Sequence, residues 1–333
     1  MRNVTIEDVA NRCGVSRATV SRVINRGERV KPSTIRKVNE AIQELGYKPN
    51  ANAVALSGGK TKTVGVLLPG TWRDYYNPLL NGMDQVAARK GYYLLLRSKN
   101  YLADAARIAD EGRADGFIIR NMSDPAGHEK LFAALTKKGI PFILIGNALA
   151  EYPSIKIDNI GGARRIAHHF ADHEFRKILF IAGPESNIDS SDRFYGFKLG
   201  LSEKGIDPAG LLVTTGDYST GSGYAALERE FHRTRPDAVF AANDRMALGA
   251  LMYLRKIGAR VPGDIALAGF DDPFFAEHLS PSLTTVRQPI FEMGTIAMES
   301  IIQLLQDPRP ETRHIILPAQ LVVREIGRAS CRE

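Results

Sequence analysis

The sequence predicts two kinds of structure in one chain: an N-terminal all-α helix-turn-helix head, and an α/β body of two doubly wound parallel-sheet lobes. Three observations predict it. The chain has 333 residues, enough for several domains. Residues 1–60 hold 11 Lys and Arg against 5 Asp and Glu, whereas the remaining residues hold 33 against 32. From residue 61 onward, short apolar runs alternate with amphipathic stretches, as parallel strands and covering helices do.

The head begins with a helix that Thr5 can cap, and Asp8 completes a weak capping box. Gly14 can end this helix in the left-handed conformation, and Ser16 can cap a second helix. A third helix is expected to start at a Ser33 cap and to stop at Gly46. The three helices have apolar positions at helical spacing, so they can bury one another: Ile6, Val9, Ala10, Cys13; Val20, Val23, Ile24; Ile35, Val38, Ile42, Leu45.

A helix-turn-helix places its second helix in the major groove of double-stranded DNA. Arg17 and Arg22 can grip guanine edges there, whereas Ala18 can only contact a thymine methyl group. Phosphate contacts that set the register suit a second group of side chains: Thr5, Ser16, Thr19, Ser21 and Asn25. The alternative is that both arginines are ordinary exposed helix residues. The excess positive charge of the head favours a polyanion partner.

The run TIEDVANRCGVSRATVSRVIN, followed by LGYKPNANAVALSGG, resembles the DNA-binding head of the lactose-repressor/purine-repressor (LacI/GalR) family. The resemblance implies a DNA-binding domain over 1–48 and a hinge helix and linker over 49–60. Asn50 would cap the hinge helix and Leu56 would wedge into the minor groove at the central step of the operator. A helix this short is marginal in water, so it should order only on DNA. A buried core role for Leu56 is the alternative.

The body spans 61–325, and apolar runs mark its expected strands: Val64–Leu68, Tyr92–Leu96, Phe117–Ile119, Phe142–Ile145, Ile178–Ile181, Leu211–Thr214, Ala238–Ala241 and Ile265–Ala268. Helical stretches lie between them, among them Pro78–Lys90, Gly162–Asp172 and Arg245–Lys256. The same family has a body that resembles a periplasmic sugar-binding protein. The resemblance implies a first lobe of about 61–159 and 289–318, a second lobe of about 160–288 and 319–325, and a homodimer.

Ligands of doubly wound sheets bind at the carboxyl ends of the strands. Polar and aromatic residues at these ends match family effector contacts: Tyr75, Tyr76, Asp189, Arg193, Tyr218, Asn243, Asp244 and Asp271. Arg and Asp bind hydroxyls or a carboxylate, and Tyr stacks on an apolar ring face, so a sugar-like effector is expected. For Asn243 and Asp244, capping of the next helix is an equal alternative to ligand contact. For Arg193 the alternative is a surface position on its helix, and Asp272 is expected to be structural.

Other classes of protein fit the sequence less well. An enzyme using the same two-lobe cleft is the main alternative, but no nucleotide-binding or nucleophile motif is present, and no cofactor is expected. His169 and His173 lack a third metal ligand in sequence, so no metal site is expected. An exported binding protein would need a signal segment. No apolar run is long enough to span a membrane, and two cysteines fit a reducing compartment, so we expect a cytoplasmic protein.

The last eight residues, IGRASCRE at 326–333, follow LVVRE, where members of the family usually end. This segment has no periodicity and matches the translation of a sequencing-library adapter. We interpret it as a non-native tail, which would leave Cys13 as the only native cysteine.

Overall fold

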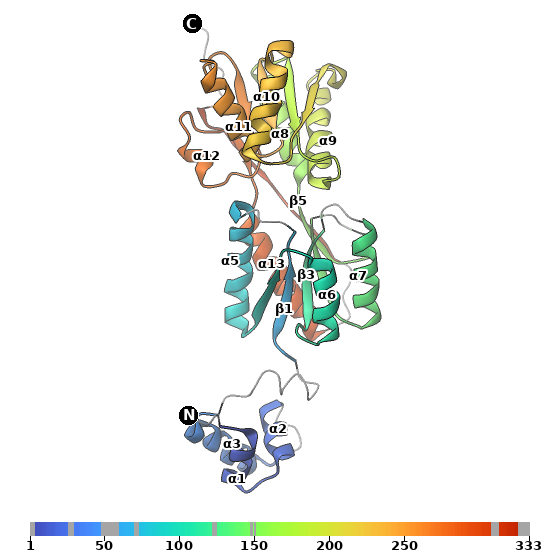
Figure 1. Cartoon of the computed structure of the whole chain (residues 1–333), viewed down its shortest axis with the longest axis vertical. Coiled ribbons are helices and arrows are strands. Elements are labelled where there is room, and N and C mark those ends of the chain that lie inside the picture. The colour runs from blue at the N-terminus through green and yellow to red at the C-terminus, as the bar shows by residue number, and fades with distance from the viewer. Residues whose placement is uncertain are drawn as a thin grey trace.

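The computed structural model describes residues 4–25, 30–47, 60–69, 73–121, 125–146, 149, 151–307 and 313–325. Three groups of elements follow one another along the long axis of Figure 1: the head helices, a first lobe and a second lobe. Both lobes have parallel sheets covered by helices, as the sequence predicts. No helix among the described residues is both long and apolar enough to cross a membrane.

The head consists of α1 (Ile6–Cys13), α2 (Arg17–Asn25) and α3 (Pro32–Leu45). The capping box at Thr5 is confirmed, since its hydroxyl accepts from the Asp8 amide and the Asp8 carboxylate accepts from the Thr5 amide. Gly14 and Gly46 end their helices with φ of 66° and 62°. The Ser33 cap is wrong: the N-cap is Lys31, two residues earlier, and α3 begins at Pro32, whose fixed φ suits the first helical position.

The first lobe is built on a parallel six-stranded sheet of order β11-β5-β4-β3-β1-β2. Its strands are β1 (Thr63–Leu67), β2 (Tyr93–Arg97), β3 (Gly116–Asn121), β4 (Phe142–Gly146), β5 (Ser154–Ile157) and β11 (His314–Leu317). Its helices are α5 (Arg73–Lys90), α6 (Tyr101–Asp110), α7 (Pro125–Lys137) and α13 (Ile290–Gln306). β5 and β11 are absent from the apolar runs singled out in the sequence, because each has only four residues, of which two are polar in β5 and one, His314, in β11.

Helices α5 and α13 lie side by side in Figure 1, and two glycines permit their close approach. A Cβ atom at Gly82 would lie 2.1 Å from the Phe291 carbonyl oxygen, and one at Gly294 would lie 2.0 Å from that of Leu79. The helix predicted to begin at Pro78 begins at Arg73 instead, and Pro78 lies inside it. Tyr75 and Tyr76 are therefore helical residues rather than loop residues.

The second lobe is built on a parallel four-stranded sheet of order β7-β6-β8-β9. Its strands are β6 (Ile178–Ala182), β7 (Leu212–Thr215), β8 (Ala238–Ala241) and β9 (Ala266–Ala268). Its helices are α8 (Asn159–Asp172), α9 (Ile188–Glu203), α10 (Thr220–Thr234), α11 (Asp244–Lys256) and α12 (Phe275–His278), with a 3-10 turn at Pro208–Gly210. Four fully buried phenylalanines fill the space between sheet and helices: Phe170, Phe180, Phe197 and Phe240.

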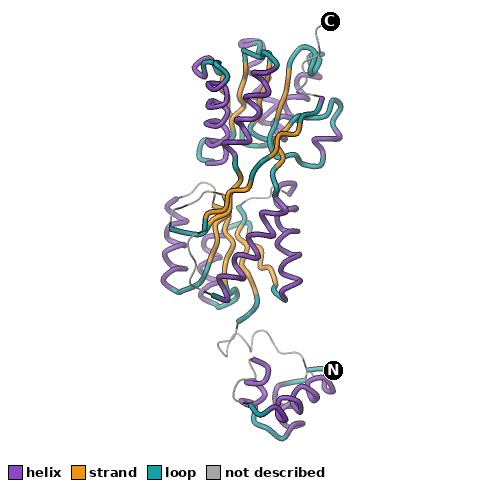
Figure 2. The backbone as a smooth tube through the Cα atoms, turned by 180° about the vertical axis from the view of Figure 1, so that it is seen from behind, coloured by secondary structure: helices purple, strands orange, loops and turns teal. Residues whose placement is uncertain are grey.

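The chain passes between the lobes three times: from β5 to α8, from β10 (Thr285–Arg287) to α13, and from β11 to β12 (Gln320–Val322). β10 and β12 pair with each other in a two-stranded antiparallel sheet. Figure 2 shows the crossing segments running together between the two lobes.

Candidate ligand cleft and DNA-binding face

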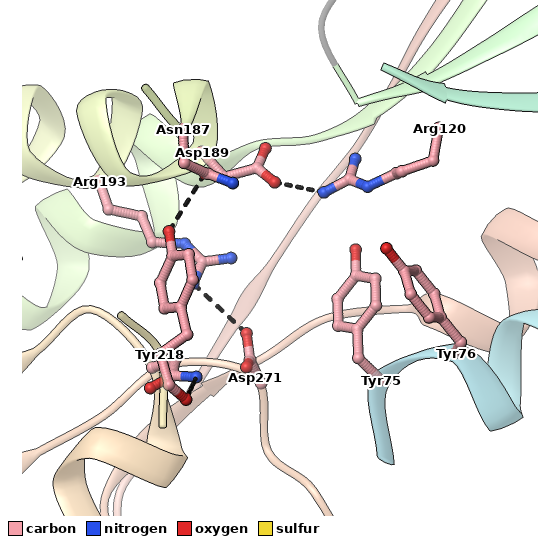
Figure 3. Close-up of a pocket in the computed structure, with 9 residues that line it drawn as sticks. Tyr75, Tyr76, Arg120, Asn187, Asp189, Arg193, Tyr218 and Asp271 are labelled. Carbon is pink, nitrogen blue, oxygen red and sulfur yellow. Dashed lines mark hydrogen bonds and ion pairs between the residues drawn. The ribbon is translucent and has the colours of Figure 1, made fainter. Parts of the chain in front are cut away.

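A cleft of about 420 Å³, including its open mouth, lies between the carboxyl ends of the two sheets. The first lobe lines it with Tyr75, Tyr76 and Arg120, and the second lobe with Asn187, Asp189, Arg193, Tyr218, Asn243 and Asp271. Figure 3 labels all of these except Asn243 and shows the labelled side chains of the two lobes converging on the cleft. Seven of the eight residues predicted from strand ends are therefore brought together, Asp244 being the exception.

Arg193 is the most extensively bonded residue of the cleft. It lies on α9, only 4% of it is exposed, and its Nε donates to Asn159 Oδ1 at 2.9 Å. Its Nη1 donates to the Ala242 carbonyl at 2.6 Å and lies 3.4 Å from Asp271 Oδ1. The guanidinium also stacks 3.9 Å from the centre of the Phe270 ring. The surface alternative for Arg193 is thus wrong.

Arg120 and Asp189 form an ion pair across the cleft, and only the tertiary structure reveals it. Arg120 is the penultimate residue of β3 in the first lobe, and Asp189 lies in the first turn of α9 in the second. Burial opposes ionisation of Asp189, but the nearby charges of Arg120 and Arg193 hold its pKa below the usual range. Arg120 was missed in the sequence, although it follows the apolar run Phe117–Ile119 as the other cleft residues follow theirs.

Two helix caps, Asn187 and Asn243, line the cleft and hold Tyr218 between them. Asn187 caps α9 by accepting from the Ser190 amide at 3.1 Å, and it also accepts from the Tyr218 hydroxyl at 3.1 Å. Asn243 caps α11 through the Met246 amide and donates to the Tyr218 carbonyl at 3.1 Å. Burial raises the pKa of Tyr218, so its hydroxyl stays protonated at neutral pH. The capping interpretation of Asn243 is confirmed, and its side chain also lines the cleft.

Asp271 has an unusual backbone and an unusual carboxyl group. Its φ of 127° lies in a region that side-chain-bearing residues rarely adopt, which is a form of strain typical of functional sites. Gln288 donates to its Oδ1 at 2.5 Å. Burial raises the pKa of Asp271 to about 6, against the opposing charge of Arg193. Its protonation state is therefore sensitive to any charge that enters the cleft.

Asp244 is structural, which corrects its prediction as a ligand contact. Its side chain is fully buried and is not among those that line this cleft. Both carboxylate oxygens accept from the Thr285 hydroxyl, at 2.7 and 2.8 Å, and one accepts from the Asp272 amide. Asp272 is also structural, as predicted, since Arg287 and Arg324 pair with it at 2.6 and 2.7 Å.

The cleft can bind a polar ligand in two ways. Guanidinium, carboxylate, amide and hydroxyl groups converge on it and can hydrogen-bond to hydroxyls or an oxyanion, while tyrosine rings offer apolar surface. Tyr75 and Tyr76 contact each other edge to face, 5.4 Å between ring centres, and burial raises the pKa of Tyr75. Elsewhere, the His169 and His173 rings lie 4.6 Å apart, but no cluster of three metal-ligating side chains occurs within the described ranges.

The predicted DNA-binding face is the exposed side of α2. Ser16 caps α2 through the Thr19 amide at 3.2 Å, and Arg17, Ala18 and Arg22 are exposed beyond it. Arg17 also lies 3.3 Å from Glu7 of α1, a pair that is open to solvent. Thr19 and Ser21 are half-buried. Three predicted DNA contacts cannot be placed, because the Asn25 side chain, Asn50 and Leu56 lie outside what the structure describes. The hinge and linker residues 48–59 and the proposed non-native tail 326–333 also lie outside it.

Two family models match the chain. Residues 5–50 match the model of bacterial regulatory proteins of the lacI family, and residues 167–325 match that of the periplasmic binding protein-like domain. Catabolite control protein A of Priestia megaterium is 32% identical over 331 residues, which cover 97% of this chain and 99% of that protein.

Solved structures agree with this relationship. A complex of the transcriptional regulator CelR with cellobiose is 32% identical, with a TM-score of 0.73, and covers 97% of this chain and 100% of that one. A lac repressor dimer bound to operator and an anti-inducer is 28% identical, with a TM-score of 0.85, and covers 98% of this chain and 100% of that one.

Proposed function

Since the chain belongs to the LacI family of bacterial regulatory proteins, it is a DNA-binding transcriptional regulator and not an enzyme, and from this premise we propose that it is a repressor controlled by a sugar-like effector. The observation that carries the proposal is one chain combining a basic helix-turn-helix head with a two-lobe body whose cleft holds paired arginines and aspartates. The cellobiose bound to the similar regulator CelR supports a sugar-like ligand. As a gene regulator it would act in the cytoplasm.

On DNA, two heads of a homodimer would occupy half-sites about one helical turn apart in a pseudo-palindromic operator. Arg17, Ala18 and Arg22 would contact bases, with Asn50 and Leu56 forming the hinge that inserts at the centre. The dimer bound to operator in the similar lac repressor structure supports this assembly. In this chain, α5 and the edge strand β2 offer a first-lobe surface, since Tyr93 is 73% and Leu96 47% exposed.

The effector would act by changing the angle between the lobes. It would contact Tyr75, Tyr76, Asp189, Arg193, Tyr218, Asn243 and Asp271, groups that belong to both lobes. The division into lobes near 159/160, 288/289 and 318/319 fits the sheets to which the strands belong. Linkage requires reciprocity: an effector that weakens operator binding is itself bound more weakly by the operator complex.

Selection of bound DNA from a random pool at about physiological salt tests the DNA-binding half of the proposal, since nonspecific contacts are weakened there. The expected result is enrichment of a two-fold symmetric site. No enrichment, with and without added metabolite pools, would contradict it. Arg193→Ala and Asp271→Ala test the cleft: both should abolish the effector response with operator binding intact, and a normal response in both would move the site elsewhere.

A further inference from the structure

Arg120 holds a hydrogen-bond donor that the protein leaves without a partner. Only 5% of the residue is exposed, and its Nη2 pairs with Asp189 across the cleft. Among the buried side-chain nitrogen and oxygen atoms of the described residues, its Nε alone has no hydrogen-bond partner. A buried donor without an acceptor is costly, and native structures tolerate few of them. The arrangement fits a donor whose acceptor arrives with a ligand.

The carboxylates of the cleft are already engaged. Asp189 accepts from Arg120 through Oδ2, and it accepts from the side-chain Nδ2 of Asn159 through Oδ1 at 3.0 Å. Asp271 accepts from Gln288 and lies beside Arg193. In Figure 3, the Arg120 guanidinium extends over the opening between Asp189 and the hydroxyl ends of Tyr75 and Tyr76. Arg120 thus lines the cleft, and its buried Nε lies on the side of the guanidinium toward the hydroxyl ends of Tyr75 and Tyr76.

The formal charges of the cleft balance one another, and two helix ends add partial positive charge. Two guanidinium groups, of Arg120 and Arg193, balance two carboxylates, of Asp189 and Asp271. The N-terminal ends of α9 and α11 add partial positive charge, since their caps, Asn187 and Asn243, both line the cleft. This partial positive charge favours an anion over a cation, and the one vacant donor suits a single carboxylate.

We propose that the effector of this cleft is an acidic sugar whose carboxylate accepts a hydrogen bond from Arg120 Nε. The inference rests on the proposed function and names the ligand class of the same site. A charge-assisted bond between guanidinium and carboxylate is about twice as strong as a neutral one. Arg120 is then the residue that selects acidic over neutral sugars, while Arg193, Asp271 and the tyrosines bind the ring and its hydroxyls.

The test begins with metabolite extracts, since the effector itself is unidentified. Full-length protein is incubated with extract fractions separated on an anion-exchange resin at pH 7, and the shift of its unfolding temperature is measured. The expected stabilising activity is retained on the resin, elutes with salt and survives phosphatase treatment. Activity in the neutral flow-through, or destroyed by phosphatase, would overturn the acidic-sugar inference and leave the proposed function standing. No activity in any fraction would overturn both.

Variants then locate the anion. Arg120→Gln should weaken binding of the retained fraction about 100-fold, the effect of losing a bond to a charged group. Arg120→Lys should restore part of it. Arg97→Gln is the matched control, because it removes an Arg–Asp pair of the same lobe outside the cleft, the pair with Asp104, and should bind as the wild type does.

Arg120→Gln leaves Asp189 without its partner and can destabilise the fold. The double variant Arg120→Gln/Asp189→Asn removes both charges together and avoids this cost. It should still lose the acidic ligand, and glucose or galactose should gain relative to glucuronate or galacturonate. Retention of wild-type affinity for the acidic fraction by the double variant would overturn the role of Arg120.

Discussion

Gln288 donates a 2.5 Å hydrogen bond to Asp271, and this bond joins the ligand cleft to a crossing between the lobes. Gln288 follows β10 and precedes α13, a first-lobe helix that packs against α5 through Gly82 and Gly294. Asp271 in turn lies beside Arg193 of the second lobe. A ligand that contacts Asp271 therefore acts on a residue held directly by the segment that connects the lobes.

Gln288→Met should separate ligand binding from its effect on DNA. We expect ligand affinity to change by a few fold only, while the ratio of operator affinities with and without ligand falls from the usual range of about 5 to 150 toward 1. Both quantities are measured by titrating the variant, first with the active metabolite fraction and then with the selected operator. An unchanged ratio would mean that coupling bypasses this bond.

Asp271→Asn should stabilise the protein at high pH. The pKa of Asp271 is raised to about 6, mainly by burial, so the folded state holds a proton that the unfolded chain releases near pH 4. The stability conferred by this proton is present below pH 4 and is lost as the pH rises to 6. The variant cannot ionise, so its free energy of unfolding at pH 8 should exceed that of the wild type by about 2 to 3 kcal/mol.

Denaturant unfolding of wild type and Asp271→Asn at a series of pH values measures this difference. The two stabilities should converge near pH 4. A constant difference across that range would show that the carboxyl group is not the source.

Asp244→Ala should destabilise the body without removing a ligand contact. It leaves the Thr285 hydroxyl and the Asp272 amide without their buried acceptor, at a cost of about 2 to 4 kcal/mol. Asp244→Asn keeps an acceptor oxygen and should cost less. Thermal unfolding gives the stabilities, and ligand titration at low temperature gives the binding. Loss of ligand binding by a folded Asp244→Asn protein would return this residue to the contacts.

Arg22→Ala should relax base preference at one position of each half-site, because a bidentate arginine discriminates bases by about 1 to 3 kcal/mol. Arg36→Ala is a matched control: this arginine is also exposed on the head but belongs to α3. Both variants should bind less tightly as charge is lost. If the selected site is the same for Arg22→Ala and the control, Arg22 contacts phosphate rather than bases.

Leu56→Ala should weaken operator binding while sparing the salt-sensitive binding to random DNA. The apolar wedge is expected to stabilise only a kinked central step, which nonspecific DNA does not present. Binding to operator and to random duplex is compared over a range of salt concentrations. Equal losses on both would remove Leu56 from the hinge mechanism.

The sequence alone determined the features that depend on neighbouring residues. The capping box of Thr5 and Asp8, the helix stops at Gly14 and Gly46 and the strand at Ala238–Ala241 all follow from local chemistry and periodicity. Strand ends also marked seven of the cleft residues, because parallel strands deliver their carboxyl ends to one edge.

Only the tertiary structure decided which charged side chains are buried and which groups they pair with. Asp244 and Asp271 both follow strands, yet Asp244 is fully buried and accepts from Thr285, whereas Asp271 lies beside Arg193 in the cleft. Arg120 acquires its role from Asp189, 69 positions away in the chain and in the other lobe. Burial and pairing depend on contacts between distant segments, and no local pattern encodes where a side chain finds its partner.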